Sequence, residues 1–431
     1  MASIVIGSAP AEGRRRSVSR LADTAAWSFW FAQQAKLFLA YLLFSDNPAA
    51  ATLAGGVVSL GFASGVFVLT LVRGSTGTKI SWPASARWIL YFVLWSGTTL
   101  LWTQAASRMV ALAYWALMAL DLVVVFTLFR LAYPPRVAER SCQGFVWGSV
   151  AIASVAVLGG ARLQDRPGLG AELLHPNFIG NQFALGALLA FCLAVHAWNR
   201  HRRRGEGWKW LALALLLLMA LAGTLSKTAI AGFVLAFGVL VLRGRVGLRG
   251  GILLTVGVSL VFLLSFDAIR SNIDEYLQVE QAPDADFTFT GRIPLWVQTL
   301  EMIHERPLMG HGFLSFRDRG PQLFSFRVTT AHNEWIHLWF SLGIVGVLLA
   351  AVIYGTLIVH LRRTARVPAL SVPASAGTAL LTYFLARGLM EASLTNLVFP
   401  LTLLVVILGW TASPTRAPAS SSQTISNRSR Q

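Results

Sequence analysis

The chain has 431 residues, of which 55% are hydrophobic and only 13% are charged, and its mean hydropathy is +0.60. This composition excludes an ordinary soluble domain of such length and indicates a protein that uses the lipid bilayer as its solvent. The formal net charge of +17 could indicate a nucleic-acid partner, but in a membrane protein cytoplasmic loops rich in Lys and Arg account for it, so no nucleic-acid partner is expected.

Apolar runs of about eighteen or more residues recur along the chain and predict an all-α polytopic membrane protein with about twelve transmembrane helices. The expected spans cover residues 25–45, 50–72, 87–104, 109–133, 142–160, 176–198, 208–225, 228–243, 250–266, 333–360, 369–389 and 394–412. The basic segment 1–24 precedes an apolar run too long for a cleavable signal peptide, so a retained signal anchor is expected. Residues 413–431 are expected to form a disordered cytoplasmic tail.

The distribution of basic residues predicts a cytoplasmic N-terminus and C-terminus, because every short basic loop then falls inside. Three connections remain outside: residues 161–175, the turn at 226–228, and a loop over 267–332. The expected division is therefore nine spans in 25–266, a periplasmic loop in 267–332 and three spans in 333–412. A connection as long as 267–332 is expected to hold short helices and a function.

Within this loop, apolar residues at helical spacing after Gly291 predict a short amphipathic helix, with Pro294 in its first turn and Pro307, Gly310 and Gly312 ending it. Arg292 then lies at the helix N-terminus, where free amides and the helix dipole favour an anion such as phosphate. A solvated loop arginine is the alternative reading.

Two further places carry charge at the outer boundary of the membrane. Ser226 and Lys227 form a hairpin between two apolar spans, where the lysine either serves a function or extends its charged end to the interface. Arg387 and Glu391 lie one helical turn apart near the outer end of the span 369–389 and form either a functional or a structural ion pair.

His332 and Asn333 stand where the long loop re-enters the membrane. A histidine there suits general-base catalysis, although capping of the following helix is an alternative, and His337 is a weaker candidate. The chain contains no metal-binding motif, P-loop or dinucleotide fingerprint, so neither a metal nor a cofactor is expected. Cys142 and Cys192 show no disulfide or metal spacing and receive no role.

Four stretches together resemble the O-antigen ligase/polymerase superfamily of bacterial glycan-assembly enzymes. They are His175-Pro-Asn177 with Gly180, Ser226-Lys227-Thr228, Gly291-Arg292 through Trp296 and Pro307 to Gly310-His311-Gly312, and His332-Asn333 followed by Gly343 and Gly346. Many members of the superfamily have an arginine where this chain has Lys227, which keeps the charge but loses bidentate geometry.

The resemblance implies an inner-membrane glycosyltransferase that takes a polyprenyl-diphosphate-linked glycan at the periplasmic face and acts by inversion without a metal. It implies that Arg292 and Lys227 hold the diphosphate and that His332 accepts the acceptor's proton. Ser226, His175, Asn177, Asn333, Arg387 and Glu391 are the other expected substrate-binding residues. Partners in chain-length control or export are expected only by analogy with the superfamily.

Three hypotheses for the function remain, and the glycan acceptor separates the first two. A polysaccharide polymerase would add the glycan to another carrier-linked repeat unit, and the Gly310-to-Phe313 stretch with the His175 element favours this reading. An O-antigen ligase would transfer it to the lipid A core instead. A lipid-linked glycan flippase or transporter is the remaining alternative, for which Lys36 and Asp121 within predicted spans are the best argument, although a buried structural pair explains them equally well.

Overall fold

The computed structural model describes residues 9–43, 48–73, 82–158, 176–199, 204–243, 289–323, 328–392, 394 and 399–412. Within these ranges all regular structure is helical, which confirms the all-α class. The helices are α1 (Ala9–Leu43), α2 (Pro48–Arg73), α3 (Ala84–Thr98) with the 3-10 turn η1 (Thr99–Leu101), α4 (Arg108–Leu131), α5 (Pro134–Leu158), α6 (Pro176–Asn199), α7 (Arg204–Gly223), α8 (Lys227–Leu242), α11 (Phe289–Glu305), α12 (Ser315–Leu323), α13 (Glu334–Thr364), the 3-10 turn η3 (Pro368–Leu370), α14 (Ser371–Gly388) and α15 (Phe399–Thr411).

The chain is a polytopic membrane protein. Six of the described helices are long and apolar enough to cross a bilayer, namely α2, α4, α6, α7, α13 and α14, and α8 and α15 are shorter apolar helices. Each expected span coincides with a helix except 250–266, which lies outside the described residues. The count of about twelve spans is therefore not confirmed, and the tail 413–431 also lies outside the described part.

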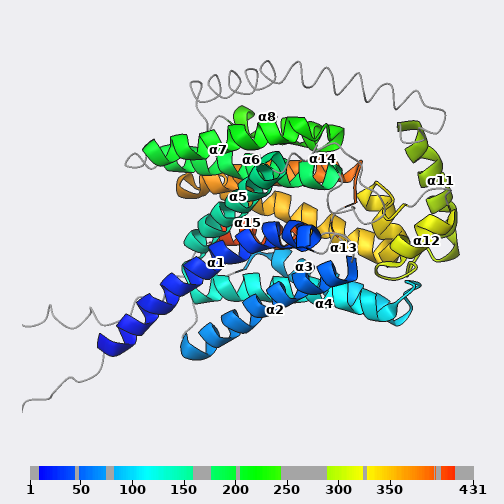
Figure 1. The fold of residues 1–431 in the computed structure, drawn as a ribbon, viewed down its shortest axis with the longest axis horizontal. Helices are drawn as coiled ribbons and strands as arrows, with labels where there is room; N and C mark the ends of the chain where they lie inside the picture. The colour runs from blue at the N-terminus through cyan, green and yellow to red at the C-terminus, as the bar shows by residue number, and fades with distance from the viewer. Residues whose placement is uncertain are drawn as a thin grey trace, which may run out of the picture.

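The central helix of the bundle is α6, whose apolar span is 94% buried, whereas α2 is only 17% buried and exposes most of its apolar side chains as a lipid-facing helix does. α5 packs between α6 and the long helix α1 (Figure 1). The helix α1 begins at Ala9, within the segment 1–24 that was expected to be a basic N-terminal extension, and Val18 and Ala22 are buried there.

Lys36 and Asp121 form a buried pair between α1 and α4. The Lys36 Nζ lies 3.7 Å from an Asp121 carboxylate oxygen and donates to the Ser59 hydroxyl at 2.7 Å. Both side chains are at most 8% exposed. The structural pair that the sequence left open is therefore present.

A break in α13 divides this helix into a short segment before Gly343 and a long apolar segment after it. Gly343 has φ +68° and ψ −175°, values outside the helical region. The freed backbone groups pair with residues 307–312: the Phe340 and Ser341 carbonyls accept from His311 and Gly312, and Ile344 donates to the Pro307 carbonyl. The loop after α11 is thus joined to the membrane helix by main-chain hydrogen bonds.

Only glycine fits this junction. A Cβ on Gly343 would lie 2.1 Å from the Leu308 carbonyl oxygen, and one on Gly310, which also has positive φ, would lie 2.4 Å from the Gly343 nitrogen. The Pro307-to-Gly312 stretch and Gly343 therefore belong to one structural feature, which holds α11 and the start of α13 at one end of the bundle.

Candidate active site

Helices α11 and α12 stand across one end of the bundle, at the right in Figure 1. The same end receives the N-termini of α6, α8 and α13 and the C-terminus of α14, and we call it the site end. The opposite end, where α13 and α15 finish, is called the far end. Segments distant in sequence meet at the site end, and most of the residues singled out from the sequence therefore lie there.

Glu391, three residues after α14, is the centre of this cluster. One carboxylate oxygen lies 2.9 Å from the His332 Nδ1, and the other accepts from the Asn177 amide at 2.8 Å and from the Arg292 guanidinium at 3.2 Å. The Glu391 side chain is 7% exposed, against 26% for His332 and 20% for Arg292. The carboxylate is thus the buried anchor of two partly exposed cationic or basic side chains.

The charge state of Glu391 follows from its neighbours. Burial alone would raise the pKa of this carboxyl, but the hydrogen bond and charge of His332, together with Arg387 and Arg292, lower the pKa to about 2. The carboxylate is therefore ionised at neutral pH and can only accept hydrogen bonds. The His332 Nδ1 must then carry a proton, so that in the neutral ring the Nε2 is the basic nitrogen.

Arg387 lies within the last turn of α14 and is 4% exposed. Its charge is one of the three that lower the pKa of Glu391, so the two residues are electrostatically coupled as the sequence suggested. The structure also joins Glu391 to His332 and Arg292 from other segments, so the carboxylate belongs to a larger network than the expected ion pair.

Asn177 and Ser226 connect this network to the turn between α7 and α8. The Ser226 hydroxyl donates to the Asn177 side-chain carbonyl at 3.0 Å, while the Asn177 amide donates to Glu391. Gly180, one turn along α6, allows the turn to approach, because a Cβ there would lie 2.7 Å from that of Ser226. His175, expected to act beside Asn177, lies outside the described residues.

Lys227 is the first residue of α8 and is exposed at the site end. Ser226 is the N-cap of this helix, yet its side chain makes no capping hydrogen bond, since the hydroxyl is directed to Asn177 instead. The first amides of α8 lack intrahelical acceptors, as in any helix, and lie next to the Lys227 ammonium-bearing side chain. A helix start of this kind favours an anion.

The helix α11 begins earlier than its sequence pattern suggested. It starts at Phe289, so Arg292 lies in its first turn and Pro294 stands inside the helix. Leu295, Met302 and Ile303 are buried, whereas Ile293 is 51% exposed. Arg292 lies one turn before Leu295, on the buried face of α11, and is therefore directed inward. Its guanidinium also donates to the Met390 carbonyl at 3.0 Å.

Asn333 has a structural task beside His332. Its side-chain oxygen accepts from the Trp335 and Ile336 amides and caps α13, and its amide donates to the Leu389 carbonyl at 3.1 Å. The preceding His332 has φ +47°, an uncommon conformation for a non-glycine residue that turns its ring toward Glu391. Asn333 therefore caps the helix that follows, whereas His332 joins the network.

Two other histidines are placed differently. His311 is buried: its Nδ1 pairs with the Gln104 side chain and its Nε2 with the Met302 carbonyl, and its ring stacks on Phe340. His337 is also buried, under Phe316. Both rings pack inside the site end, and the His337 Nδ1 accepts from the Ala331 amide at 3.5 Å.

Sequence reasoning did not single out Glu334. This residue is 3% exposed, and both carboxylate oxygens lie 3.1 Å from the Leu394 amide nitrogen. The sequence did contain a signal for this residue: Glu334 lies between Asn333 and an apolar helix, where a buried acid is costly unless it has a partner.

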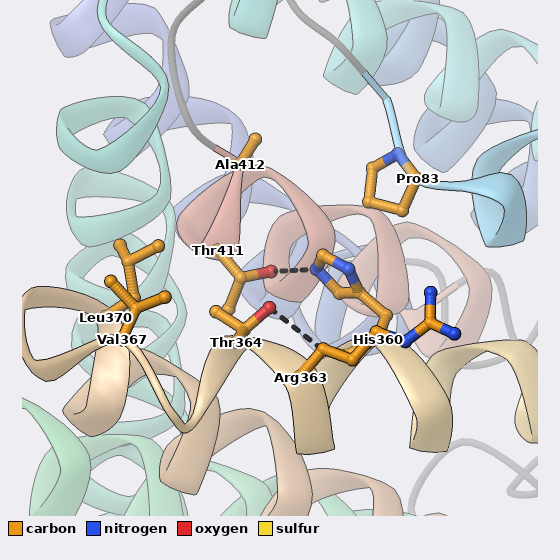
Figure 2. A pocket seen from close by; sticks show the side chains of 8 residues that line it. All are labelled: Pro83, His360, Arg363, Thr364, Val367, Leu370, Thr411 and Ala412. Atoms are coloured by element: carbon orange, nitrogen blue, oxygen red, sulfur yellow. Dashed lines mark hydrogen bonds between the residues drawn. The ribbon is translucent and has the colours of Figure 1, made fainter.

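Two observations bear on other kinds of site. The described residues include no group of three or more His, Cys, Asp or Glu side chains arranged to hold a metal ion. A hollow of about 300 Å³ lies at the far end, where Figure 2 shows the His360 ring facing the Thr411 hydroxyl at 2.9 Å. It is remote from the site end and shares no residue with the cluster around Glu391.

Comparison with known proteins places one segment in a family. Residues 211–351 match the family model described as O-antigen ligase. The match includes Ser226, Lys227, Arg292 and His332, whereas Asn177 and Glu391 lie outside it and join the cluster only through the fold. None of the curated proteins compared with the chain matches it.

Proposed function

We propose that the site end of this membrane protein transfers a polyprenyl-diphosphate-linked glycan to an acceptor hydroxyl, and the match of residues 211–351 to the family model described as O-antigen ligase supports this proposal. The observation that carries the proposal is the pairing of the His332 Nδ1 with the buried, ionised Glu391, in a cluster that also contains Arg292. This geometry supplies a base and a cation at one place on the membrane boundary.

In the proposed reaction, His332 is the general base. Because Glu391 holds the proton-bearing Nδ1, the Nε2 accepts the proton of the attacking hydroxyl, and Glu391 stabilises the imidazolium that forms. The acceptor oxygen bonds to the anomeric carbon as the bond from that carbon to the diphosphate oxygen breaks. Displacement in one step inverts the sugar and releases polyprenyl diphosphate.

The leaving diphosphate requires positive charge that is already in place. Arg292 uses two N–H groups for Met390 and Glu391, and a guanidinium has five. Lys227 and the first amides of α8 provide a second cationic position. In the proposal these groups bind the diphosphate in the ground state and stabilise the charge that develops as it leaves.

The proposed location is the inner membrane with the site end facing the periplasm. Arg73 and Arg130 lie at the ends of α2 and α4 away from the site, and Arg362 and Arg363 lie in the last turn of α13. Short basic connections of this kind are retained on the cytoplasmic side. A site on the other side would meet carrier-linked glycans after they have crossed the membrane.

Two acceptors remain as candidate functions. A polymerase would use another carrier-linked repeat unit, and this is the assignment that the sequence favoured. His311, one basis of that preference, is a packing residue, and His175 lies outside the described residues, whereas the matched family model is described as O-antigen ligase. The description favours transfer to the lipid A core as the second candidate.

The first test is glycan transfer in proteoliposomes that contain the purified full chain and a polyprenyl-diphosphate-linked repeat unit. His332→Ala is expected to lower kcat by about 10²- to 10⁴-fold, the range for loss of a general base. His304→Ala, at an exposed histidine of α11, is the matched control and should leave transfer unchanged. Transfer that needs no metal should survive a chelator.

The outcomes separate the alternatives. Full activity in a correctly inserted His332→Ala protein would remove this residue from the mechanism. Movement of the lipid between leaflets without transfer would make the protein a flippase. Surface glycans of a deletion strain then identify the acceptor, because unlinked long chains indicate a lost ligase and single repeat units a lost polymerase.

A further inference from the structure

The segment that follows α14, described at residues 389–392 and 394, carries Glu391 and makes several contacts with other elements. Asn333 donates to the carbonyl of Leu389, and Arg292 donates to the carbonyl of Met390. The segment thus holds its shape partly through side chains that arrive from the loop before α13 and from α11. Any looseness here would move the Glu391 carboxylate relative to His332.

Glu334 fixes the other side of this segment. Its two carboxylate oxygens both lie 3.1 Å from the amide nitrogen of Leu394, three residues after Glu391. Its Cβ is the nearest neighbour that a side chain on Gly388 would meet, at 3.3 Å, so Glu334 also packs against the end of α14. The first turn of α13 therefore contacts the chain before and after Glu391.

The same turn of chain orients the base. His332 stands two residues before Glu334, and the cap made by Asn333 ties both to the start of α13. His332 is thus placed by the main chain at the start of α13, and Glu334 in the first turn of the same helix contacts Leu394, in the chain that follows Glu391. A shift of about 1 Å between such groups is enough to cost catalysis heavily.

Keeping the Glu334 carboxylate buried costs free energy, because its charge is removed from water. Its contact with the Leu394 amide gives this buried charge a structural use, since that amide lies in the chain that follows Glu391. The negative charge also lies in the first turn of α13, where the helix dipole stabilises it.

We propose that Glu334 is a positioning residue that sets the Glu391 carboxylate against His332 through the Leu394 amide. This inference rests on the proposed glycan transfer. Glu334 itself contacts no reacting group in this scheme, and its effect on the reaction passes through Glu391.

The test measures kcat and KM for transfer by Glu334→Ala, Glu334→Asp and Glu334→Gln proteins in proteoliposomes. Glu334→Ala is expected to lower kcat about tenfold with KM within about twofold. Glu334→Asp keeps the charge but withdraws the oxygens by one methylene, so its kcat should fall similarly. Glu334→Gln keeps an acceptor oxygen at full length and should recover kcat to within about threefold of wild type.

A double-mutant cycle distinguishes positioning from general support of the fold. If Glu334 acts through Glu391, adding Glu334→Ala to Glu391→Gln should lower kcat by less than about twofold more. Glu301→Ala, at an exposed acid of α11, is the control for loss of a glutamate at this end and should behave as wild type.

Independent, multiplicative effects of the Glu334 and Glu391 substitutions would overturn the inference, and so would failure of Glu334→Gln to recover kcat. If Glu334→Ala does not fold, the Glu334→Asp protein carries the same cycle, because its kcat is also expected to fall. Absence of transfer by the wild-type protein would instead refute the proposed function, so the two failures are distinguishable.

Discussion

Neutralising Glu391 without changing its shape is the perturbation that tests the site most directly. In Glu391→Gln the side chain keeps its size and its hydrogen-bonding reach but loses the charge shared by His332, Arg292 and Arg387. The amide can also present an N–H toward the His332 Nδ1, which would leave that nitrogen unprotonated. The variant therefore removes both the stabilising charge and the correct tautomer.

The pKa of Glu391 provides the magnitude. Against an opposing burial effect, its cationic neighbours lower this pKa from 4.5 to about 2, which corresponds to about 3 kcal/mol at 1.36 kcal/mol per pKa unit. His332 provides the largest lowering contribution. Loss of the whole ~3 kcal/mol from the transition state would lower the rate about 10²-fold. The equivalent change in a Ser-His-Asp triad lowers kcat about 10⁴-fold because the tautomer is wrong. We expect a loss of at least about 10²-fold.

The assay is single-turnover transfer in proteoliposomes, with Glu301→Gln as the matched control on α11. A decrease in the transfer rate of less than about threefold in a correctly inserted Glu391→Gln protein would refute the reasoning. The charge of Glu391 would then contribute little to the function of His332 as a base. A depressed carboxyl pKa contributes stability that is present above pH 4.5 and is lost as the pH falls through about 2. Glu391 consequently stays ionised from pH 5 to 8, and pH effects in that window come from other groups.

Three further predictions use other features. Arg292→Lys should lower kcat about 10²-fold, because an ammonium cannot reproduce the guanidinium's planar contacts, whereas Arg306→Lys at an exposed position should behave as wild type in the same transfer assay. Gly343→Ala should lower the free energy of unfolding by at least about 2 kcal/mol, while Gly355→Ala in the same helix, with open space around it, should be neutral or slightly stabilising in thermal melts. Burial lowers the pKa of His311, so its folded form favours the neutral ring, and stability present above about pH 6.5 should decline as the pH falls below it; a His311→Gln protein should show a flatter thermal-stability profile between pH 7.5 and 5.

The class of the protein and most of its helices are properties of hydropathy. An apolar run must form a helix in lipid because no water is present to satisfy its backbone, so spans such as α4 and α6 follow from local composition. The ends of helices depend on packing and are less predictable: α1 extends to Ala9 because Val18 and Ala22 find a buried surface on a neighbouring helix, and α11 includes Pro294.

The individual motifs can also be recognised from the sequence. Which of them belong to the candidate site and which build the fold cannot be recognised in this way. Arg292 and His332 attracted attention through residue type and position, and the structure brings them to the same carboxylate. The Gly310-to-Gly312 stretch and Gly343 looked similarly distinctive, yet they build the junction between the α11 loop and α13. Only the path of the main chain in three dimensions separates a glycine that permits a close approach from a residue that faces the substrate.

By itself, the sequence determined an all-helical membrane protein with charged residues at one membrane boundary and a resemblance to glycan-transferring enzymes. Tertiary structure alone decided that Glu391 lies between His332, Arg292 and Asn177, and that Glu334 binds the segment that carries it. Hydropathy and helical periodicity act over one turn or one span and are visible in a single stretch of chain. A contact between residues 177 and 391 depends on how α6 and α14 pack in three dimensions, and no local pattern records that.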